Sequence, residues 1–322
     1  MVAPASPAEG GPGADMRVSF LGTSAFAVPS LERLVSAGHE VGVCVTPPDR
    51  PSGRGLRPAA SPVKEAAQRL GLTLAQPERL TPELLSASRP ELGVAVAYGR
   101  LVPQAVLEVP RHGMVGLHPS LLPAYRGAAP VAWALLNGET ATGVTIFRMT
   151  DRLDAGEILL QRRVEIAADD DAETLASRLA SLGAEALLEA IEAIASGRAR
   201  AAPQEEAKAT LAPKLTKADG RLRWREPAEA LARRIRATAP WPGASTAWEG
   251  RALKIWRAQA DAAAPTTAPP GTVVSAGVNG IVVATGRGTL TLHELQPAGR
   301  RRMRAEEFLA GHALRAGAQF EG

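Results

Sequence analysis

The sequence predicts an α/β protein with a parallel-rich sheet in its N-terminal part and a smaller β-barrel domain in its C-terminal part. An apolar strand at 17–21, a segment of helical period at 26–37 and a second strand at 40–45 form a β-α-β unit, which implies parallel strands. Beyond residue 220, short β-branched runs alternate with Gly-rich turns, a pattern typical of a small barrel. The 322 residues suffice for about two domains of ordinary size.

Further elements continue the first pattern along the chain. Strands are predicted at 72–75, 92–97 and 115–118, and the run at 92–97 is apolar on both faces, which indicates a central strand. Helices are predicted at 62–70 and 172–196. The first strand ends in Gly-Thr-Ser-Ala rather than Gly-x-Gly-x-x-Gly, so a dinucleotide cofactor has no support.

The C-terminal part changes in character after a Pro- and charge-containing segment at 203–217. One helix is predicted at 227–237, and short strands are predicted at 221–224, 253–256, 271–274, 280–284 and 289–292. Small barrels of this kind include the OB type, which often binds nucleic acid. We therefore expect a disordered N-terminal extension at 1–15, a first domain at 16–202, a linker at 203–217 and an OB-like domain at 218–322.

Composition places the chain among ordinary globular proteins, with 45% hydrophobic residues. The single cysteine, Cys44, lies in an apolar run and cannot form an internal disulfide, which favours a reducing cytoplasm. No apolar run approaches the ~20 residues that a membrane span needs. Residues 1–15 lack the basic start and apolar core of a signal peptide, so we expect a cytoplasmic protein.

The charge is distributed unevenly around a formal net charge of +4. Residues 203–322 hold 18 Lys and Arg against 11 Asp and Glu, a net of +7, whereas residues 1–202 hold 19 against 22, a net of −3. A basic C-terminal part suggests a polyanionic partner. A solvated basic surface explains the charge alone equally well, so charge does not decide between the two.

The most informative stretch is an apolar strand at 115–118 that ends in His118, with Pro119 fixing the backbone behind it. A second stretch, 143–156, is a β-branched run that ends in a turn with Asp154. Because the carboxyl ends of parallel strands meet at one edge of a sheet, we expect His118 and Asp154 to meet there. Taken singly, His118 could be a packed histidine and Asp154 a turn former.

Taken together, these stretches resemble the folate-dependent formyltransferases. The similarity rests on Leu-His-Pro-Ser-Leu-Leu-Pro at 117–123, Arg-Gly-Ala-Ala-Pro at 126–130, and Gly-Val-Thr-Ile and Leu-Asp-Ala-Gly within 143–156. It extends to Pro-Asp-Arg-Pro-Ser-Gly-Arg-Gly at 48–55 and Leu-Gln-Pro-Ala-Gly at 295–299, and so covers the chain from Met16 nearly to its end. Within the family, the chain is most similar to members that formylate methionyl-initiator tRNA, and the family's first domain is Rossmann-like.

The resemblance implies an enzyme of translation initiation that transfers a formyl group from 10-formyltetrahydrofolate to the α-amine of methionine on initiator tRNA. It assigns catalysis to His118, which would stabilise the oxyanion and manage the proton, and to Asp154, which would raise the pKa of His118. The folate would be lined by Tyr98, Gly99, Leu101, Ser120, Leu121, Leu122 and Pro123. The tRNA would be contacted by Arg50, Arg54, Arg57, Arg300, Arg301 and Arg302. The reaction requires no metal, and the sequence offers no metal-ligand cluster.

One position departs from the family's pattern. The family carries Asn-x-His in this strand, and its asparagine amide helps to bind the formyl oxygen, but here Gly116 takes that position. Loss of one oxyanion donor costs about 10²–10³ in rate. The sequence alone therefore predicts that Gly116→Asn accelerates catalysis, unless the site has compensated.

Two other functions remain open at this point. One is a formyltransferase acting on another amine, either glycinamide ribonucleotide or a nucleotide-linked amino sugar, and the other is a homologue that binds tRNA or folate without turnover. The basic C-terminal part and the Arg-rich loop at 50–57 oppose the first, and the presence of both His118 and Asp154 opposes the second. Nothing in the sequence requires more than a monomer.

Overall fold

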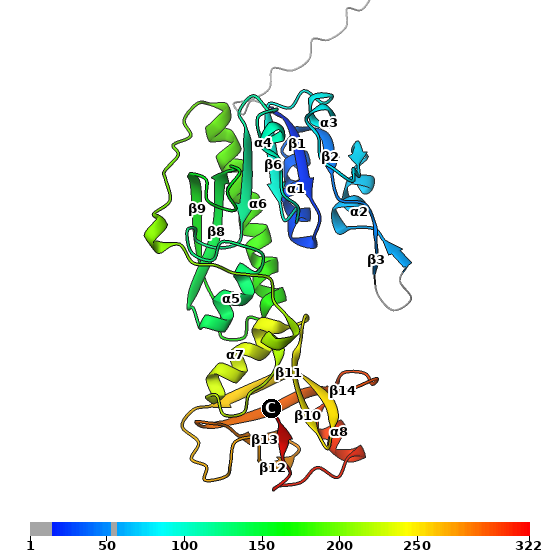
Figure 1. The fold of residues 1–322 in the computed structure, drawn as a ribbon, viewed down its shortest axis with the longest axis vertical. Helices are drawn as coiled ribbons and strands as arrows, with labels where there is room; N and C mark the ends of the chain where they lie inside the picture. Colours follow the sequence, from blue (N-terminus) through cyan, green and yellow to red (C-terminus); the bar gives the residue numbers. More distant parts are fainter. Residues whose placement is uncertain (1–14, 53–56) are drawn as a thin grey trace, which may run out of the picture. The chain divides into compact units, whose positions relative to one another are not determined.

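The computed structural model describes residues 15–52 and 57–322, which form two compact units (Figure 1). The first unit contains the described residues up to Arg126, together with 143–164 and 177–211. The second unit contains 127–142, 165–176 and 212–322. Of the residues singled out from the sequence, Arg54 and all of the predicted extension except Asp15 lie outside the described residues.

A parallel-rich sheet is the basis of the first unit, which confirms the α/β fold predicted from the sequence (Figure 1). The strands are β1 (Arg17–Gly22), β2 (Glu40–Val45), β5 (Leu74–Ala75), β6 (Leu92–Val96), β7 (Met114–His118), β8 (Ala141–Arg148) and β9 (Ile158–Glu165). Their order in the sheet is β5-β2-β1-β6-β7-β8-β9. The pairs from β5 to β7 are parallel, and β8 is antiparallel to β7. Two further strands, β3 (Arg50–Ser52) and β4 (Arg57–Ala59), form a separate antiparallel ladder.

The α-helices between residues 17 and 195 are α1 (Val28–Ser36), α2 (Pro62–Arg69), α3 (Pro82–Ser86), α4 (Gln104–Leu107), α5 (Pro130–Asn137) and α6 (Ala172–Ala195). Proline lies in the first two positions of α1, α2, α3 and α5. It is tolerated there because the first N–H groups of a helix have no intrahelical acceptor. Ser61 also caps α2, since its Oγ accepts from the backbone N–H of Lys64 at 3.1 Å.

Burial of β6 and β7 on both faces explains their uninterrupted apolar sequences. On one side, α6 approaches β7 closely at Gly183, where a Cβ would lie 2.7 Å from Cδ2 of Leu117. The absence of a side chain at Gly183 therefore permits the close packing of helix on strand. This packing fixes β7, and the last residue of β7 is His118.

The direction of β8 corrects the expected route by which Asp154 reaches His118. In the β7–β8 ladder His118 lies opposite Thr145, and Val115 lies opposite Arg148. The carboxyl end of β8 therefore lies beside the start of β7. The prediction that His118 and Asp154 meet at a shared carboxyl edge of parallel strands is wrong. Asp154 reaches His118 because the turn at 149–157, between β8 and β9, folds back towards it.

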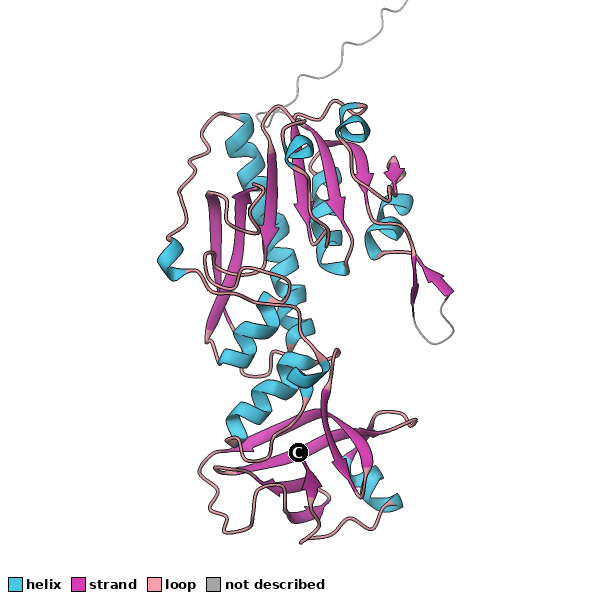
Figure 2. Cartoon of the chain, viewed as in Figure 1, coloured by secondary structure: helices cyan, strands magenta, loops and turns pink. Residues whose placement is uncertain are grey.

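An antiparallel curled sheet forms most of the second unit, as expected for an OB-like domain (Figure 2). Its strands are β10 (Ala244–Trp248), β11 (Arg251–Asp261), β12 (Val273–Gly277), β13 (Gly280–Ala284), β14 (Thr289–Pro297), β15 (Met303–Arg304) and β16 (Phe320–Glu321). Their order is β12-β13-β14-β11-β10-β16, with β15 paired to β14. An isolated bridge between Thr272 and Gln319 links the two ends of this order and so curls the sheet towards closure.

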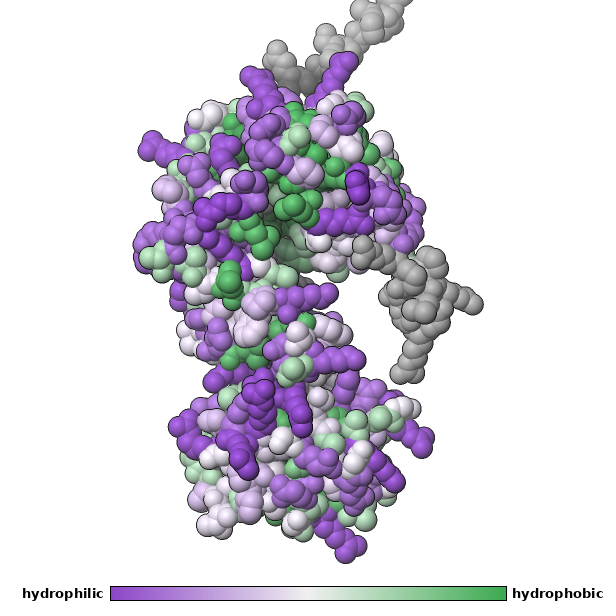
Figure 3. All heavy atoms as spheres, viewed as in Figure 1, coloured by the Kyte–Doolittle hydropathy of each residue, from purple (hydrophilic) through white to green (hydrophobic). Residues whose placement is uncertain are grey.

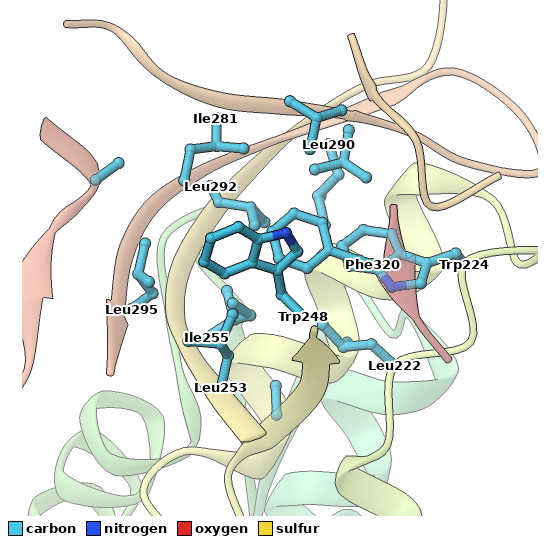
Figure 4. Close-up of a cluster of buried hydrophobic side chains, with 14 of the residues drawn as sticks. Leu222, Trp224, Trp248, Leu253, Ile255, Ile281, Leu290, Leu292, Leu295 and Phe320 are labelled. Carbon is cyan, nitrogen blue, oxygen red and sulfur yellow. The ribbon is translucent and has the colours of Figure 1, made fainter. Parts of the chain in front are cut away.

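Large aromatic and branched side chains fill the interior of this sheet (Figure 4). Trp224 stacks on Phe320 with ring centroids 5.6 Å apart, and Trp248 lies edge-on to Phe308 at 6.0 Å. Two helices, α7 (Ala228–Thr238) and α8 (Ala305–Gly311), contribute Leu231 and Phe308 to the same core. The strand predicted at 221–224 is wrong, since only Arg221 forms a bridge there and Trp224 enters the core from a turn.

Gly143 in β8 lies where the backbone of β9 leaves no room for a side chain. A Cβ at this position would lie 2.1 Å from the carbonyl oxygen of Arg162 and 2.6 Å from Cδ2 of Leu121. We therefore expect Gly143→Ala to lower the free energy of unfolding by about 1–3 kcal/mol, as overpacking does in other cores. Calorimetric unfolding midpoints would measure the loss.

The matched control is Gly277→Ala in β12, because a Cβ at Gly277 would meet no heavy atom of the described chain within 4 Å. Equal midpoints for Gly143→Ala and the unsubstituted protein would contradict the packing argument.

Candidate active site

His118 is buried at the end of β7, with 5% of its surface exposed. Its Nε2 donates a hydrogen bond to the carbonyl oxygen of Tyr125 at 2.8 Å. Its Nδ1 lies 3.6 Å from Oδ2 of Asp154. The structure thus brings together the two side chains that the sequence indicated as catalytic.

The partners of His118 determine its protonation. A carbonyl oxygen can only accept, so Nε2 carries a proton. Burial lowers the pKa of His118, and this effect outweighs the Asp154 carboxylate and the Tyr125 carbonyl, which both raise the pKa. Asp154 therefore raises the pKa as the resemblance implied, but burial outweighs this effect, and the ring is neutral near pH 7.

In the neutral ring, Nδ1 has a lone pair and faces a carboxylate. This arrangement can take up a proton at Nδ1, because Asp154 stabilises the imidazolium that forms. Since Nε2 is engaged with Tyr125, Nδ1 is also the nitrogen that can donate to a developing oxyanion once it carries a proton. One nitrogen can therefore serve proton transfer and charge stabilisation in succession.

Asp154 occupies a strained turn, with a φ of +50°. Gln204 holds the backbone of this turn, because its Nε2 donates to the carbonyl oxygens of Asp154 at 2.9 Å and Gly156 at 2.7 Å. No sequence pattern indicated Gln204, which fell in the predicted linker, because its partners lie about 50 residues earlier in the chain.

The predicted folate wall at 120–123 follows His118 directly. Ser120 and Leu122 are buried, whereas Leu121 and Pro123 are partly exposed and offer side-chain surface to a ligand. Thr145, which is fully buried, fixes this segment by donating to the carbonyl oxygen of Ser120 at 2.6 Å and accepting from the N–H of Leu122 at 3.1 Å.

The other predicted folate residues follow β6. Tyr98 is 5% exposed, and its carbonyl oxygen accepts from Oγ1 of Thr23 at 2.7 Å. Burial raises the pKa of Tyr98, whose hydroxyl has no hydrogen-bond partner within the described part of the chain. Gly99 has a φ of +75°, and Leu101 is 76% exposed.

Exposed apolar side chains accompany these residues in the first unit. Leu153 is 69% exposed and Leu211 is 77% exposed, fractions similar to the 76% of Leu101. The space-filling view shows apolar side chains gathered around a hollow on one face of this unit (Figure 3). Exposed apolar surface of this kind is typical of a site for a ring-containing ligand.

The predicted RNA-contacting arginines differ in their surroundings. The backbones of Arg50 and Arg57 lie in β3 and β4, and their side chains are outside the described part of the structure. Arg300 is exposed. Arg301 pairs with Glu307 at 2.7 Å, and Arg302 pairs with Glu294 at 2.5 Å while lying over the ring of Trp256 at 5.1 Å.

Phe147 occupies the space beside Gly116 that a side chain would need. The two residues are directly opposite each other in the β7–β8 ladder, and a Cβ on Gly116 would lie 2.6 Å from Cε1 of Phe147. The ring is 5% exposed and thus held in the core. The absence of the family's asparagine at position 116 is therefore accompanied by the large apolar side chain of Phe147 on the neighbouring strand. The sequence alone did not indicate this pairing.

Over 15–52 and 57–322, no group of three or more His, Cys, Asp or Glu residues is placed to hold a metal ion. Within the same ranges, no helix is both long enough and apolar enough to cross a bilayer.

Comparisons with known proteins agree with this architecture. The model of the formyl transferase family matches residues 16–191, and that of the formyl transferase C-terminal domain matches residues 214–313. The methionyl-tRNA formyltransferase of Solibacter usitatus is 46% identical over 303 residues, 93% of this chain and 96% of the relative. That of Thiobacillus denitrificans is 49% identical over 306 residues, 94% of this chain and 98% of the relative.

Solved structures share the fold at lower identity. An N-formyltransferase from Helicobacter canadensis, in complex with folinic acid and dTDP-3-aminofucose, has a TM-score of 0.67 at 16% identity and covers 86% of this chain and 99% of its own. HypX from Aquifex aeolicus has a TM-score of 0.65 at 19% identity and covers 92% of this chain and 49% of its own.

The fold and the matching domains together define an enzyme that transfers formyl groups. The chain belongs to the formyl transferase family, and the relatives that match it over nearly their whole length are methionyl-tRNA formyltransferases.

The contact between Gly116 and Phe147 reverses the effect expected of Gly116→Asn. The new side chain has to displace the Phe147 ring, so we expect the single variant to unfold at a lower temperature and to transfer formyl groups more slowly. Removal of the ring in Gly116→Asn/Phe147→Ala should recover part of both losses.

A double-mutant cycle over the four proteins, with Phe147→Ala as the matching single variant, measures this coupling through unfolding midpoints and transfer rates. Additive effects at the two positions would show that Phe147 does not determine the choice of glycine.

The pKa of His118 predicts how activity depends on pH. A protonated ring cannot take up a second proton at Nδ1, so kcat/KM should fall as the pH drops through the pKa of His118. Asp154 raises that pKa, so Asp154→Asn should move the acidic limb to lower pH and also reduce the plateau.

Asp151→Asn is the matched control, because Asp151 is exposed in the same turn. An acidic limb at the same pH in Asp154→Asn and Asp151→Asn would exclude Asp154 as the carboxylate that acts on His118.

Proposed function

We propose that this chain transfers the formyl group of 10-formyltetrahydrofolate to the amino group of methionine esterified to initiator tRNA. The buried His118–Asp154 pair, with Nδ1 and Oδ2 at 3.6 Å, is the observation that carries the proposal. Relatives named methionyl-tRNA formyltransferase, identical at 41–49% of positions, support the choice of substrate.

The proposed reaction uses Nδ1 of His118 for proton transfer, because Nε2 is engaged with the carbonyl oxygen of Tyr125. The neutral amine attacks the formyl carbon, a C–N bond forms, and the carbonyl electrons move to the oxygen. The amine proton passes to Nδ1 of His118, and Asp154 stabilises the resulting cation. As the bond from the formyl carbon to the folate nitrogen breaks, Nδ1 returns a proton to that nitrogen, which leaves formylmethionyl-tRNA and tetrahydrofolate.

The folate is proposed to lie against the segments that follow β6 and β7. Leu101, Leu121 and Pro123 present partly or largely exposed apolar surface there. Gly99 turns with a positive φ, and no heavy atom of the described chain would contact a Cβ at Gly99 within 4 Å, so its backbone groups can approach a ligand closely. Ser120, Leu122 and Tyr98 act through backbone groups in this proposal, because their side chains are buried.

The initiator tRNA is proposed to contact the basic C-terminal part. Arg300 is exposed, and Arg301 and Arg302 must exchange their Glu307 and Glu294 partners for phosphates. The side chains of Arg301 and Arg302 are 74% and 51% exposed, and ion pairs at the surface are weak, so the exchange costs little free energy. Arg50, Arg54 and Arg57 are proposed to reach the acceptor end of the tRNA. The boundaries at 16–202, 203–217 and 218–322, a monomeric state and a cytoplasmic location belong to the same proposal.

The decisive experiment incubates the purified chain with 10-formyltetrahydrofolate and methionine-charged initiator tRNA and measures the mass of the ester-bound amino acid. We expect a formyl gain that is lost in His118→Ala and in Asp154→Ala. His112→Ala is the control, because His112 lies in the first unit and its side chain takes no part in the pair.

Formylation of glycinamide ribonucleotide or of a nucleotide-linked amino sugar in place of the tRNA would assign the chain to another acceptor. Binding of tRNA without any mass gain would show a homologue that has lost turnover, with Gly116 as the mark of that loss.

A further inference from the structure

Gln204 uses the full hydrogen-bonding capacity of its carboxamide. Its Nε2 donates to the carbonyl oxygens of Asp154 and Gly156, at 2.9 and 2.7 Å. Its Oε1 accepts from Nε and a terminal nitrogen of Arg126, at 3.0 and 2.7 Å. Two donors and two acceptor positions are all that an amide has, so Gln204 is satisfied on every side.

The orientation of this amide is fixed by the chemistry of its partners. A guanidinium can only donate and backbone carbonyls can only accept, so the amide oxygen must face Arg126 and the amide nitrogen must face the turn of Asp154. A rotated amide would place like groups against each other on both sides. The side chain therefore has one stable arrangement, which suits it to hold two segments at a defined separation.

Arg126 connects this amide to the other side of the site. Its guanidinium is buried, with 7% of the residue exposed, and it also donates to both carboxylate oxygens of Glu206 at 3.0 and 3.1 Å. The contact lowers the pKa of Glu206, so the pair is ionised near pH 7. Tyr125, the residue before Arg126, supplies the carbonyl oxygen that accepts from His118.

The segment that contains Gln204 makes a second contact with the Asp154 turn through Glu206. Glu206 lies 3.5 Å from a terminal nitrogen of Arg152, which belongs to the turn at 149–157. This turn needs support, because it stands outside the strand ladders and holds Asp154 at a φ of +50°. All these residues belong to the first unit.

We propose that Gln204, through Arg126, is a positioning residue of the formyl-transfer reaction that holds the Asp154 turn and the Tyr125 carbonyl at matching places around His118. The proposal rests on the proposed roles of His118 and Asp154. Gln204 itself touches no substrate in this account, and its effect is on the geometry of the pair. Asp154 is the charged side chain that acts on His118 in the described part of the chain.

The test is Gln204→Glu, which keeps the shape and the Arg126 contact but sets a carboxylate oxygen against two carbonyl oxygens. We expect kcat to fall about 10–100-fold, the loss that a small misplacement of a catalytic group causes, with KM for both substrates nearly unchanged. Gln204→Ala should show the same pattern. Gln68→Ala, at an exposed position of α2, is the matched control.

Two readouts separate positioning from a general loss of structure. In the substituted proteins without substrate, the pKa of His118 measured by NMR should fall, because Asp154 raises it only when the carboxylate is near. In the Asp154→Asn background, which keeps a reduced plateau rate, Gln204→Glu should cost little additional rate, since there is no carboxylate left to position.

The NMR readout stands whether or not the chain formylates tRNA, so failure of the proposed function and failure of this inference are distinguishable. An unchanged His118 pKa in folded Gln204→Glu would overturn the inference. So would rate losses that multiply fully in the double variant with Asp154→Asn.

Discussion

The hydrogen bond from Nε2 of His118 to the carbonyl oxygen of Tyr125 is the constraint on which the first unit depends. A buried imidazole has to place its N–H on an acceptor, and this acceptor cannot donate in return. The bond therefore decides which ring nitrogen remains for chemistry, and Asp154 lies on that side. The buried strand β7 and the turn at 149–157 supply the two halves of this arrangement.

Local sequence predicted the elements well, and it predicted their relations less well. The β-α-β opening, the central strand β6 and the barrel strands follow from periodicity and turn residues, which are local properties. The direction of β8 cannot be predicted from such properties, because a β-branched run has the same pattern in a parallel strand and in an antiparallel strand. The strand expected at 221–224 failed for a related reason: Leu222 and Trp224 are buried by a turn that enters the barrel core.

The candidate site shows the same division. Motifs that are contiguous in the sequence placed His118 and Asp154, and the structure sets them 3.6 Å apart. The residues that support the site are distant from it in the sequence. Gln204 holds a turn about 50 residues earlier in the chain, and Phe147 lies on β8, opposite Gly116 of β7. The direction in which the pKa of His118 is shifted could not be predicted from the sequence either. Burial outweighs the effect of the Asp154 carboxylate, and burial is a property of the folded chain.

The contact between Gly116 and Phe147 also couples the volumes of two positions on neighbouring strands. A residue with a side chain at 116 and the Phe147 ring claim the same volume, so a chain that carried both would be overpacked. A chain with glycine at 116 and a small residue at 147 would instead contain a cavity, which is destabilising as well. The sum of the two side-chain volumes is therefore constrained more tightly than either residue alone, and a substitution at one position is tolerated best together with a compensating substitution at the other.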